Sequence, residues 1–439
     1  NQVEQWTNNG YANLNDVATD PQGFLAPQTA QFNTLFNDLV GKKNNETEGG
    51  TRFYDRSSLV HVHGEKIFKP WWADEIRLGA NMRRYTPDSD GTIFSDTNGR
   101  VIANQEVGLY TGIKRHFLED KLIATATVRA DKNQNFNLVM SPAASLVWTP
   151  TPTDFVRLSF SSALRNPTLA DQYLFLNVGP ATLVGNLEGA QDLVTVQSFI
   201  NYRNSSSGTN IAFNLDTLQY FDIAPLRPEQ VRTLEAGYRT TLGEKLYLDA
   251  NYYFSWYSHF IGYNIGLDVQ FENPQFPEFI TGIDVYRYAA NSLNQVQTQG
   301  ASLGFNYFLD DNFTLNGNYS WNKLVKTDED DPIIPAFNTP EHKYNLGLTG
   351  RGLEAKGKDS WGFSLNYRWV QGFVFEGSPQ FTGFVPAYDL LDGQVNYKFD
   401  AQGLTVKAGA SNLLKNEHIE TYGGPTVGRL AYISFAMDL

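Results

Sequence analysis

The chain has 439 residues, a formal net charge of −13, no cysteine and 14% aromatic residues. The negative charge argues against nucleic acid as a partner, and the lack of cysteine excludes disulfides and thiolate metal sites. No run of 18 or more apolar residues occurs, which excludes helical membrane spans. Membrane strands are not excluded, because their residues are apolar only at alternate positions.

The first part of the chain differs in composition from the rest. Residues 1–51 are polar and rich in Asn, Gln and Gly, which predicts a long loop with one short helix near Thr29–Val40. The start, NQVEQWTNNG, lacks a charged beginning and an apolar core, so we expect a signal peptide to be absent or already removed. We divide the chain into a loop region at residues 1–51 and a strand-rich unit at residues 52–439.

Apolar and polar residues alternate repeatedly from residue 52 onward. In the clearest run, Leu248, Tyr252 and Trp256 share one face while Asp249 and Asn251 share the other. Alternation over about 8 to 12 residues predicts strands with one apolar and one polar face, of the length that membrane strands have. Fifteen strands are predicted, at about residues 52–63, 74–85, 102–116, 121–131, 135–149, 154–164, 229–242, 245–260, 294–308, 312–325, 341–351, 360–371, 387–399, 403–412 and 429–439.

The predicted connections alternate between short and long. Tight turns fall at sites such as Leu118–Asp120 and Leu309–Asp311, and long polar loops at residues 165–228, 261–293, 326–340, 372–386 and 413–428. The short link near Asp131–Gln134 is the one exception. Outer-membrane barrels have short periplasmic turns and long extracellular loops, so the alternation places the C-terminus in the periplasm.

An odd number of strands has a consequence for the whole molecule. If the last strand of fifteen runs toward the periplasm, the first does so too, which places residues 1–51 outside the cell. Bacterial single-chain barrels have an even number of strands. Either the count is wrong by one, or the chain is the later part of a larger transmembrane antiparallel β-barrel.

The C-terminal stretch from Gly403 to Leu439 carries a recognisable pattern. Its last strand places Ile433, Phe435 and Met437 on one apolar face, which a barrel surrounded by lipid can accommodate. The preceding segment, ASNLLKNEHIETYGGPTVGR, resembles the closing segment of TonB-dependent outer-membrane receptors. The residues that carry the resemblance are Asn412, Leu413, Leu414, Tyr422, Gly423, Gly424, Pro425, Gly428 and Arg429.

Further segments resemble the same family and occur in the family's order. The resemblance covers most of the chain from about residue 52 onward. It rests on MSPAASLVWTP with Arg165 and Pro167, on Pro228, Glu229, Glu235, Gly237 and Tyr238, on Asn338–Leu348 and on Val385–Phe399. Family members have 22 strands and an N-terminal plug, so the resemblance implies that this chain is strands eight to 22. The plug and about seven strands would belong to another chain or to sequence not included here.

The resemblance also implies a function. Such a protein resides in the bacterial outer membrane and imports a scarce nutrient, such as a ferric siderophore, cobalamin, an oligosaccharide or a peptide. The energy would come from the TonB–ExbB–ExbD complex, and a surface lipoprotein is a further candidate partner. We expect no catalysis, because the sequence has no GxSxG, HExxH or P-loop motif.

Two other functions remain open. The first is a complete passive porin of 14–16 strands, in which residues 1–51 add a strand or fill the lumen. The second is a soluble all-β protein that binds or hydrolyses carbohydrate. Aromatic residues at the ends of the apolar strand faces resemble the girdles of membrane barrels and disfavour the second alternative.

Aromatic side chains in the long loops are the first candidates for ligand contact, because they offer rigid apolar faces for stacking. Packing of the loops on one another, and girdle residues at the membrane interface, are the alternative explanations. The candidates are Tyr173, Phe175, Tyr220, Phe221, Phe375 and Phe381.

Three other groups of polar residues are candidate sites. His61 and His63 share one strand face and are weak metal candidates, with two polar lumen residues as the alternative. The acidic run Thr327–Asp331 is a candidate calcium site in a loop, or simply a solvated charge run. Six arginines are predicted to face the lumen, to guide an anion or to pair with acids of the plug, and to face water without it; they are Arg77, Arg83, Arg129, Arg157, Arg239 and Arg368.

Overall fold

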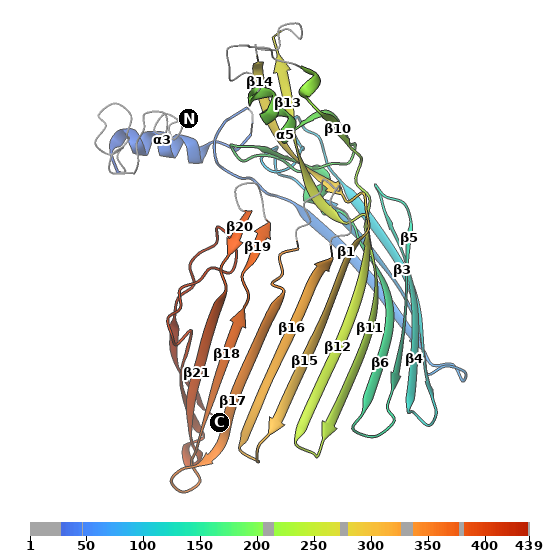
Figure 1. Cartoon of the computed structure of the whole chain (residues 1–439), viewed down its shortest axis with the longest axis vertical. Coiled ribbons are helices and arrows are strands. Elements are labelled where there is room, and N and C mark those ends of the chain that lie inside the picture. Colours follow the sequence, from blue (N-terminus) through green and yellow to red (C-terminus); the bar gives the residue numbers. More distant parts are fainter. Residues whose placement is uncertain are drawn as a thin grey trace.

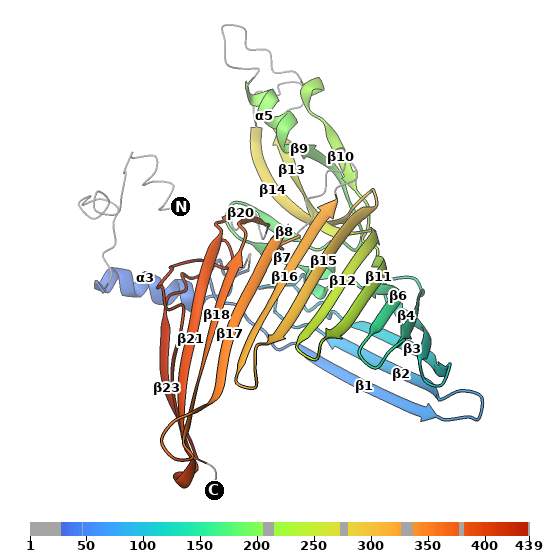
Figure 2. The same ribbon diagram turned by 60° about the horizontal axis from the view of Figure 1, so that its bottom comes forward.

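The structure is a computed structural model that describes residues 28–45, 47–204, 215–272, 280–325, 337–376 and 382–437. Within these residues fifteen antiparallel strands form one sheet, in the order in which they follow one another along the chain. The sheet curves into an open trough whose two edges are β1 and β23 (Figures 1 and 2). The strands are β1 (Ser58–Phe68), β2 (Glu75–Thr86), β3 (Asn104–Phe117), β4 (Leu122–Asn133), β5 (Val139–Trp148), β6 (Phe155–Arg165), β11 (Glu229–Leu242), β12 (Leu246–Ser258), β15 (Val296–Phe308), β16 (Phe313–Val325), β17 (His342–Glu354), β18 (Ser360–Val370), β21 (Tyr388–Phe399), β22 (Leu404–Ser411) and β23 (Leu430–Met437).

All fifteen predicted strands are present, which confirms the all-β class. The largest shift is at β1, which begins at Ser58 rather than near residue 52. The residues before Ser58 leave the sheet because they bind the connection between β2 and β3. The backbone N–H of Tyr54 donates to the Thr92 hydroxyl at 2.9 Å, and the N–H of Arg56 donates to the Asp88 carbonyl at 2.8 Å.

Short and long connections alternate between the two ends of the trough, as predicted. Residues 118–121 join β3 to β4 by a turn in which Leu118, Glu119 and Asp120 all have positive φ. The link of residues 134–138 between β4 and β5 is the one short connection at the long-loop end. The N-terminal segment reaches β1 from that same end, while β23 runs toward the short-turn end (Figure 1).

The described residues ahead of β1 form one helix, α3 (Ala30–Gly41), close to the predicted range. The Thr29 hydroxyl caps it by accepting from the backbone N–H of Phe32 at 3.2 Å. None of the helices in the described part of the chain is long and apolar enough to cross a membrane. Residues 1–27 lie outside the described residues, so the rest of the loop region remains an expectation.

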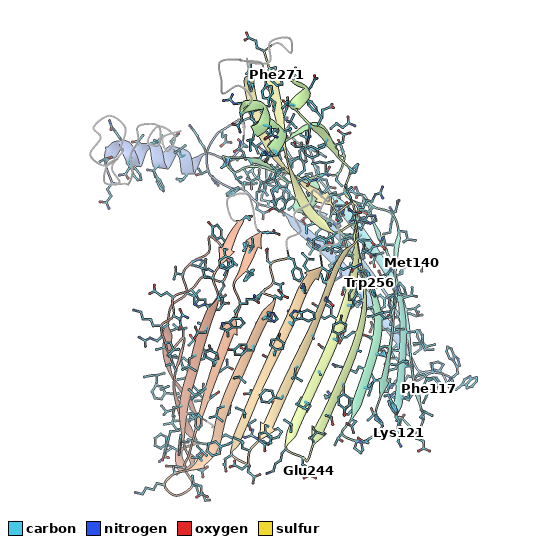
Figure 3. All side chains as sticks on the ribbon, in the orientation of Figure 1. Phe117, Lys121, Met140, Glu244, Trp256 and Phe271 are labelled. Atoms are coloured by element: carbon cyan, nitrogen blue, oxygen red, sulfur yellow. The ribbon has the colours of Figure 1, made fainter. Side chains whose placement is uncertain are left out.

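One face of the large sheet is apolar and uncovered. Aliphatic side chains in the middle of the strands are exposed, for example Leu109, Leu158 and Val395. Aromatic side chains lie toward both strand ends, such as Phe117 at the short-turn end and Trp256 at the long-loop end (Figure 3). A continuous apolar surface of this size requires a cover, and the arrangement is typical of a barrel wall that faces lipid.

The prediction of long loops at residues 165–228 and 261–293 is wrong, because strands and helices in these two segments fold together into a head above the trough (Figure 1). Its six-stranded sheet has the order β10-β9-β13-β14-β8-β7, and three of these strands are only three or four residues long. The head consists of α4 (Leu169–Tyr173), β7 (Phe175–Asn177), β8 (Thr182–Val184), β9 (Ala190–Thr195), α5 (Val196–Asn204), η1 (Leu215–Thr217), β10 (Tyr220–Ile223), β13 (Ile261–Phe271) and β14 (Ile280–Asn291). A small hairpin, β19 (Phe373–Glu376) with β20 (Thr382–Val385), and the turn η2 (Asp400–Gln402) complete the elements.

The head has its own core and is fastened to the trough. Tyr202 on α5 is fully buried with Val194 and Leu267. At the base, the Glu229 carboxylate accepts from the backbone N–H of Ile261 at 2.9 Å and lies 3.6 Å from the Arg165 guanidinium. Glu229 thus joins the ends of β6 and β11 to the start of β13.

Replacing Tyr202 by Ala is expected to unfold the head selectively. The ring is 0% exposed, stacks on Phe199 and meets Phe271 edge-on, so its loss costs about 3–5 kcal/mol. Limited proteolysis of detergent-solubilised protein measures this as faster cleavage in the head while the large sheet stays resistant. The matched control is Tyr220→Ala, because Tyr220 is 56% exposed. Equal cleavage of the two variants would refute an independent head core.

Candidate ligand-binding site

The second face of the large sheet is polar and lines the trough; we call it the lumen face. The strand register places all six predicted arginines on it. Arg83 on β2, for example, lies opposite Glu106 on β3, and Glu106 lies opposite Asn133 on β4. The prediction that these arginines face the lumen follows from the period of two in a strand.

Three of these arginines form ion pairs with carboxylates of the sheet itself. From the sequence we expect them instead to pair with acids of a plug or, without a plug, to face water. Arg77 lies 2.8 Å from Glu75, Arg129 lies 2.6 Å from Asp131, and Arg157 lies 3.2 Å from Asp249. The partner is either two residues away on the same strand or on the same face of a nearby strand. Within the described residues, Arg83 and Arg368 make no ion pair, although Arg83 lies opposite Glu106 in the strand register.

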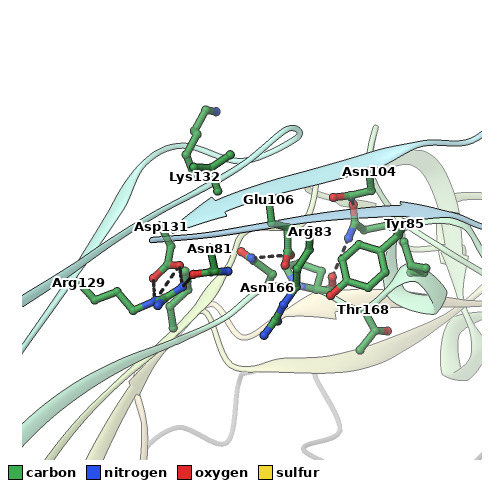
Figure 4. A pocket seen from close by; sticks show the side chains of 15 residues that line it. Asn81, Arg83, Tyr85, Asn104, Glu106, Arg129, Asp131, Lys132, Asn166 and Thr168 are labelled. Atoms are coloured by element: carbon green, nitrogen blue, oxygen red, sulfur yellow. Dashed lines mark hydrogen bonds and ion pairs between the residues drawn. The ribbon is translucent and has the colours of Figure 1, made fainter. Parts of the chain in front are cut away.

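A hollow of about 570 Å³ lies on the lumen face near the long-loop end (Figure 4). Its wall comes from β2, β3 and β4. Residues 166–172, which lead into and form most of α4, close it on the other side, and we call them the cover. Arg83, Arg129 and Lys132 line it together with the carboxylates of Glu106 and Asp131. Arg129 is held by Asp131 and by Asn81 at 2.6 Å, and Lys132 donates to the Phe136 carbonyl. Arg83 is therefore the cation of the hollow for which the described residues provide no ion pair or side-chain hydrogen bond.

The cover is attached to the wall by a network of amides, of which Gln172 and Asn104 are buried. Gln172 on α4 accepts from Asn104 and from Asn135, each at 2.8 Å, and donates to the Pro167 carbonyl at 2.6 Å. Asn166 donates to Glu106 at 2.9 Å. Buried polar groups of this kind are costly unless every partner is present, so the network fixes the position of the cover.

We expect Gln172→Ala to loosen the cover without unfolding the sheet. Buried Asn104 loses its acceptor, at about 1–3 kcal/mol, while exposed Asn135 keeps its hydrogen bond to the Tyr173 hydroxyl. Hydrogen exchange followed by mass spectrometry measures this as faster exchange in peptides that contain residues 166–175. Gln134→Ala is the control, because the Gln134 side chain is exposed on the neighbouring connection. Unchanged exchange in Gln172→Ala would contradict this role of the network.

A second connection braces the same cover. The backbone N–H of Ser95 donates to the Tyr173 carbonyl at 2.8 Å. This connection is itself held by Asp96, which accepts from the Ser89 hydroxyl at 2.6 Å and from the Gly91 N–H at 2.9 Å. Burial alone would raise the pKa of the Asp96 carboxyl, but the hydrogen bonds from Ser89 and Gly91 outweigh it and hold the pKa below its usual range. The carboxylate therefore stays ionised, and its contribution is lost only when the pH falls through that lowered pKa.

A smaller hollow of about 510 Å³ lies on the lumen face farther along the sheet. Lys343 on β17 and Arg368 on β18 line it, and Glu420 reaches it from the connection between β22 and β23. Neither cation makes an ion pair with another described residue. The lumen face thus presents free positive charge in two places near the long-loop end.

Comparisons with known proteins agree with this architecture. A family model described as TonB dependent receptor-like, beta-barrel matches residues 1–413. The chain belongs to this family. A search of curated protein sequences finds no match.

Solved structures of TonB-dependent receptors share the fold. The siderophore receptor PirA from Acinetobacter baumannii has a TM-score of 0.60 at 12% identity, over 90% of this chain and 57% of PirA. The FrpB iron transporter from Neisseria meningitidis has a TM-score of 0.57 at 13% identity, over 88% of this chain and 56% of FrpB. A variant of the ferric enterobactin receptor PfeA from Pseudomonas aeruginosa has a TM-score of 0.58 at 13% identity, over 86% and 54%. The chain therefore spans a little more than half the length of the receptors it matches.

The predicted aromatic ligand residues are spread over three places in this receptor barrel. Tyr173 is buried, and its hydroxyl accepts from Asn135 at 2.7 Å, while half-buried Phe175 lines a loop hollow of about 560 Å³. Tyr220 and Phe221 lie on β10 of the head, where Tyr220 is exposed and Phe221 packs beside Leu193 and Ile223. Phe375 lies on β19, and Phe381 lies outside the described residues. Ligand contact by any of them stays a prediction.

The metal candidates gain no further ligands. His63 lies 2.9 Å from the Tyr110 hydroxyl, which donates to Glu65 at 2.6 Å, and His61 lies beside it on β1. In the described part of the chain, no group of three or more His, Asp or Glu side chains is placed to hold a metal ion. The acidic run Thr327–Asp331 lies outside the described residues. Sequence reasoning did not find the role of Gln172, because nothing local indicates which wall a loop amide will contact.

Proposed function

We propose that the chain is the larger, C-terminal part of the barrel of an outer-membrane receptor that imports a scarce nutrient with energy relayed by TonB. The exposed apolar face with aromatic residues at both strand ends supports placement in the outer membrane. The alternating connections support an orientation with the head and α3 outside the cell and the C-terminus in the periplasm. Family membership supports TonB, ExbB and ExbD as partners.

The remaining strands and the plug are part of this proposal. Both edges of the trough, β1 and β23, are exposed along their whole described length. In a bilayer, unpaired strand edges leave backbone groups unsatisfied, so further strands must pair with them. The passive porin is disfavoured, because residues 28–57 add α3 rather than a sixteenth strand to the sheet.

The ligand class follows from the charges of the lumen face, and Arg83 carries this argument. A cation without a partner, held inside a hollow near the long-loop end, attracts an anionic ligand through charge-assisted hydrogen bonds. The similar structures include siderophore and ferric enterobactin receptors. We therefore place an anionic ferric chelate ahead of cobalamin, oligosaccharides and peptides.

The test is a thermal-shift panel on the complete receptor in detergent. An anionic ferric catecholate or hydroxycarboxylate chelate at about one hundred times its Kd should stabilise the protein by about 2.7 kcal/mol, whereas a neutral maltooligosaccharide should not. Stabilisation by the neutral sugar or by cobalamin, with none by ferric chelates, would contradict the ligand class. Protein that stays monodisperse without detergent would contradict the membrane placement.

A further inference from the structure

A groove crosses the apolar outer face of the sheet over β1, β2, β3, β4 and the start of β5. It has a volume of about 690 Å³ and is lined mainly by apolar atoms of Leu78, Ala80, Leu109, Val128 and Met140. These side chains belong to the face that points away from the lumen, so the groove is separate from the hollow around Arg83. It faces the side of the barrel that we assign to lipid.

The groove is open at β1, beside a glycine. A Cβ built on Gly64 would meet no heavy atom within 4 Å, so open space lies beside the strand at this position. Gly64 and Lys66 lie on the outer face of β1, and both line the groove. A larger side chain at residue 64 would therefore fill part of the groove without a clash with described residues.

Lys66 is the one cation among the residues that line this groove. It lies two residues before the end of β1 at the short-turn end, and it makes no ion pair with another described residue. A lysine on the lipid face of a barrel costs roughly 0–1 kcal/mol near an interface and more toward the midplane, so a counterion at this position is favourable. Lysine reaches the interface by extending its apolar stem along the groove.

We propose that this groove holds an acyl chain of an anionic phospholipid, with the phosphate of the lipid bound by Lys66. The apolar lining packs against the acyl chain, and the ammonium group of Lys66 is complementary to the phosphate. Because Lys66 lies at the short-turn end, the lipid belongs to the periplasmic leaflet. This inference rests on the proposed membrane placement and says nothing of the nutrient.

The test measures lipid that stays bound to the complete receptor. The protein is extracted with mild detergent, exchanged into mixed micelles of phosphatidylglycerol and phosphatidylethanolamine, and examined by native mass spectrometry. Wild type should retain phosphatidylglycerol in preference, and Lys66→Gln should lower that retention about fivefold. Gly64→Leu should lower retention of both lipids by filling the groove. Lys358→Gln, at an exposed lysine of another short turn, is the control and should change nothing.

The outcomes separate this inference from the proposed function. Equal phosphatidylglycerol retention by wild type and Lys66→Gln would overturn the inference. This is the result expected if a carboxylate on the strand that pairs with β1 neutralises Lys66. Equal retention of the two lipids by wild type would also overturn it. A protein that binds no lipid and needs no detergent would instead refute the membrane placement.

Discussion

Replacing Arg83 by Glu is expected to lower the affinity for an anionic chelate by roughly a hundredfold. One charge-assisted hydrogen bond is worth about 1.5–3 kcal/mol, and the new carboxylate would add repulsion beside Glu106. Titration of the purified receptor with the ferric chelate selected by the thermal-shift panel measures the effect. Because the new carboxylate would lie opposite Glu106 in the strand pair, the folding stability should fall by about 0.2–1 kcal/mol, which is too little to explain a hundredfold loss of affinity.

The control for that experiment is Arg351→Glu. Arg351 is exposed near the short-turn end of β17 and lines neither hollow of the lumen face. It should leave the affinity unchanged, which separates a local contact from the general effect of net charge. An equal loss of affinity in both variants would show that Arg83 acts only through the overall field of the barrel.

The second large effect concerns the edges of the trough. Expressed alone and refolded into detergent, this chain should fail to give a heat-resistant, compact barrel on an unheated gel. Its edges expose eleven residues of β1 and eight of β23, and unpaired backbone groups in an apolar phase cost several kcal/mol each. Addition of the polypeptide that supplies the missing strands should restore the compact, protease-resistant form.

Two substitutions serve as controls for that reconstitution. Leu109→Ala removes lipid-facing bulk from β3, which is not an edge strand, and should not prevent complementation. Val62→Pro places a proline in edge strand β1, where it removes a backbone N–H, and should weaken complementation. A compact barrel formed by the chain alone would contradict the open edges and return the passive porin to consideration.

The large sheet could be read from the sequence because its information is local. Alternation such as that from Leu246 to Trp256 identifies both the strand and the face on which each side chain lies. The same period placed Arg83 and Arg129 on the lumen face before their neighbours were known. The start of β1 was missed because Tyr54 and Arg56 are held by a connection more than thirty residues away.

The head could not be read in this way because its pairing is distant. β8 has three residues and pairs in parallel with Tyr286–Tyr288 of β14, about one hundred positions later. β13 itself alternates, with Ile261, Tyr263 and Ile265 set against Gly262, Asn264 and Gly266, so the strand was readable from the sequence although its partners were not. The cover of the hollow is hidden for a similar reason, since Gln172 finds Asn104 across 68 positions. Such contacts depend on how the barrel brings its loops together.

The mass of the native particle tests the central claim most directly. The receptor is extracted from outer membranes in detergent, and its native mass is compared with the mass of the denatured chain. The proposed completed barrel predicts polypeptide beyond the 49.3 kDa of these residues, either in one longer chain or in a tightly bound second one. A heat-stable barrel with a native mass of 49.3 kDa would contradict it.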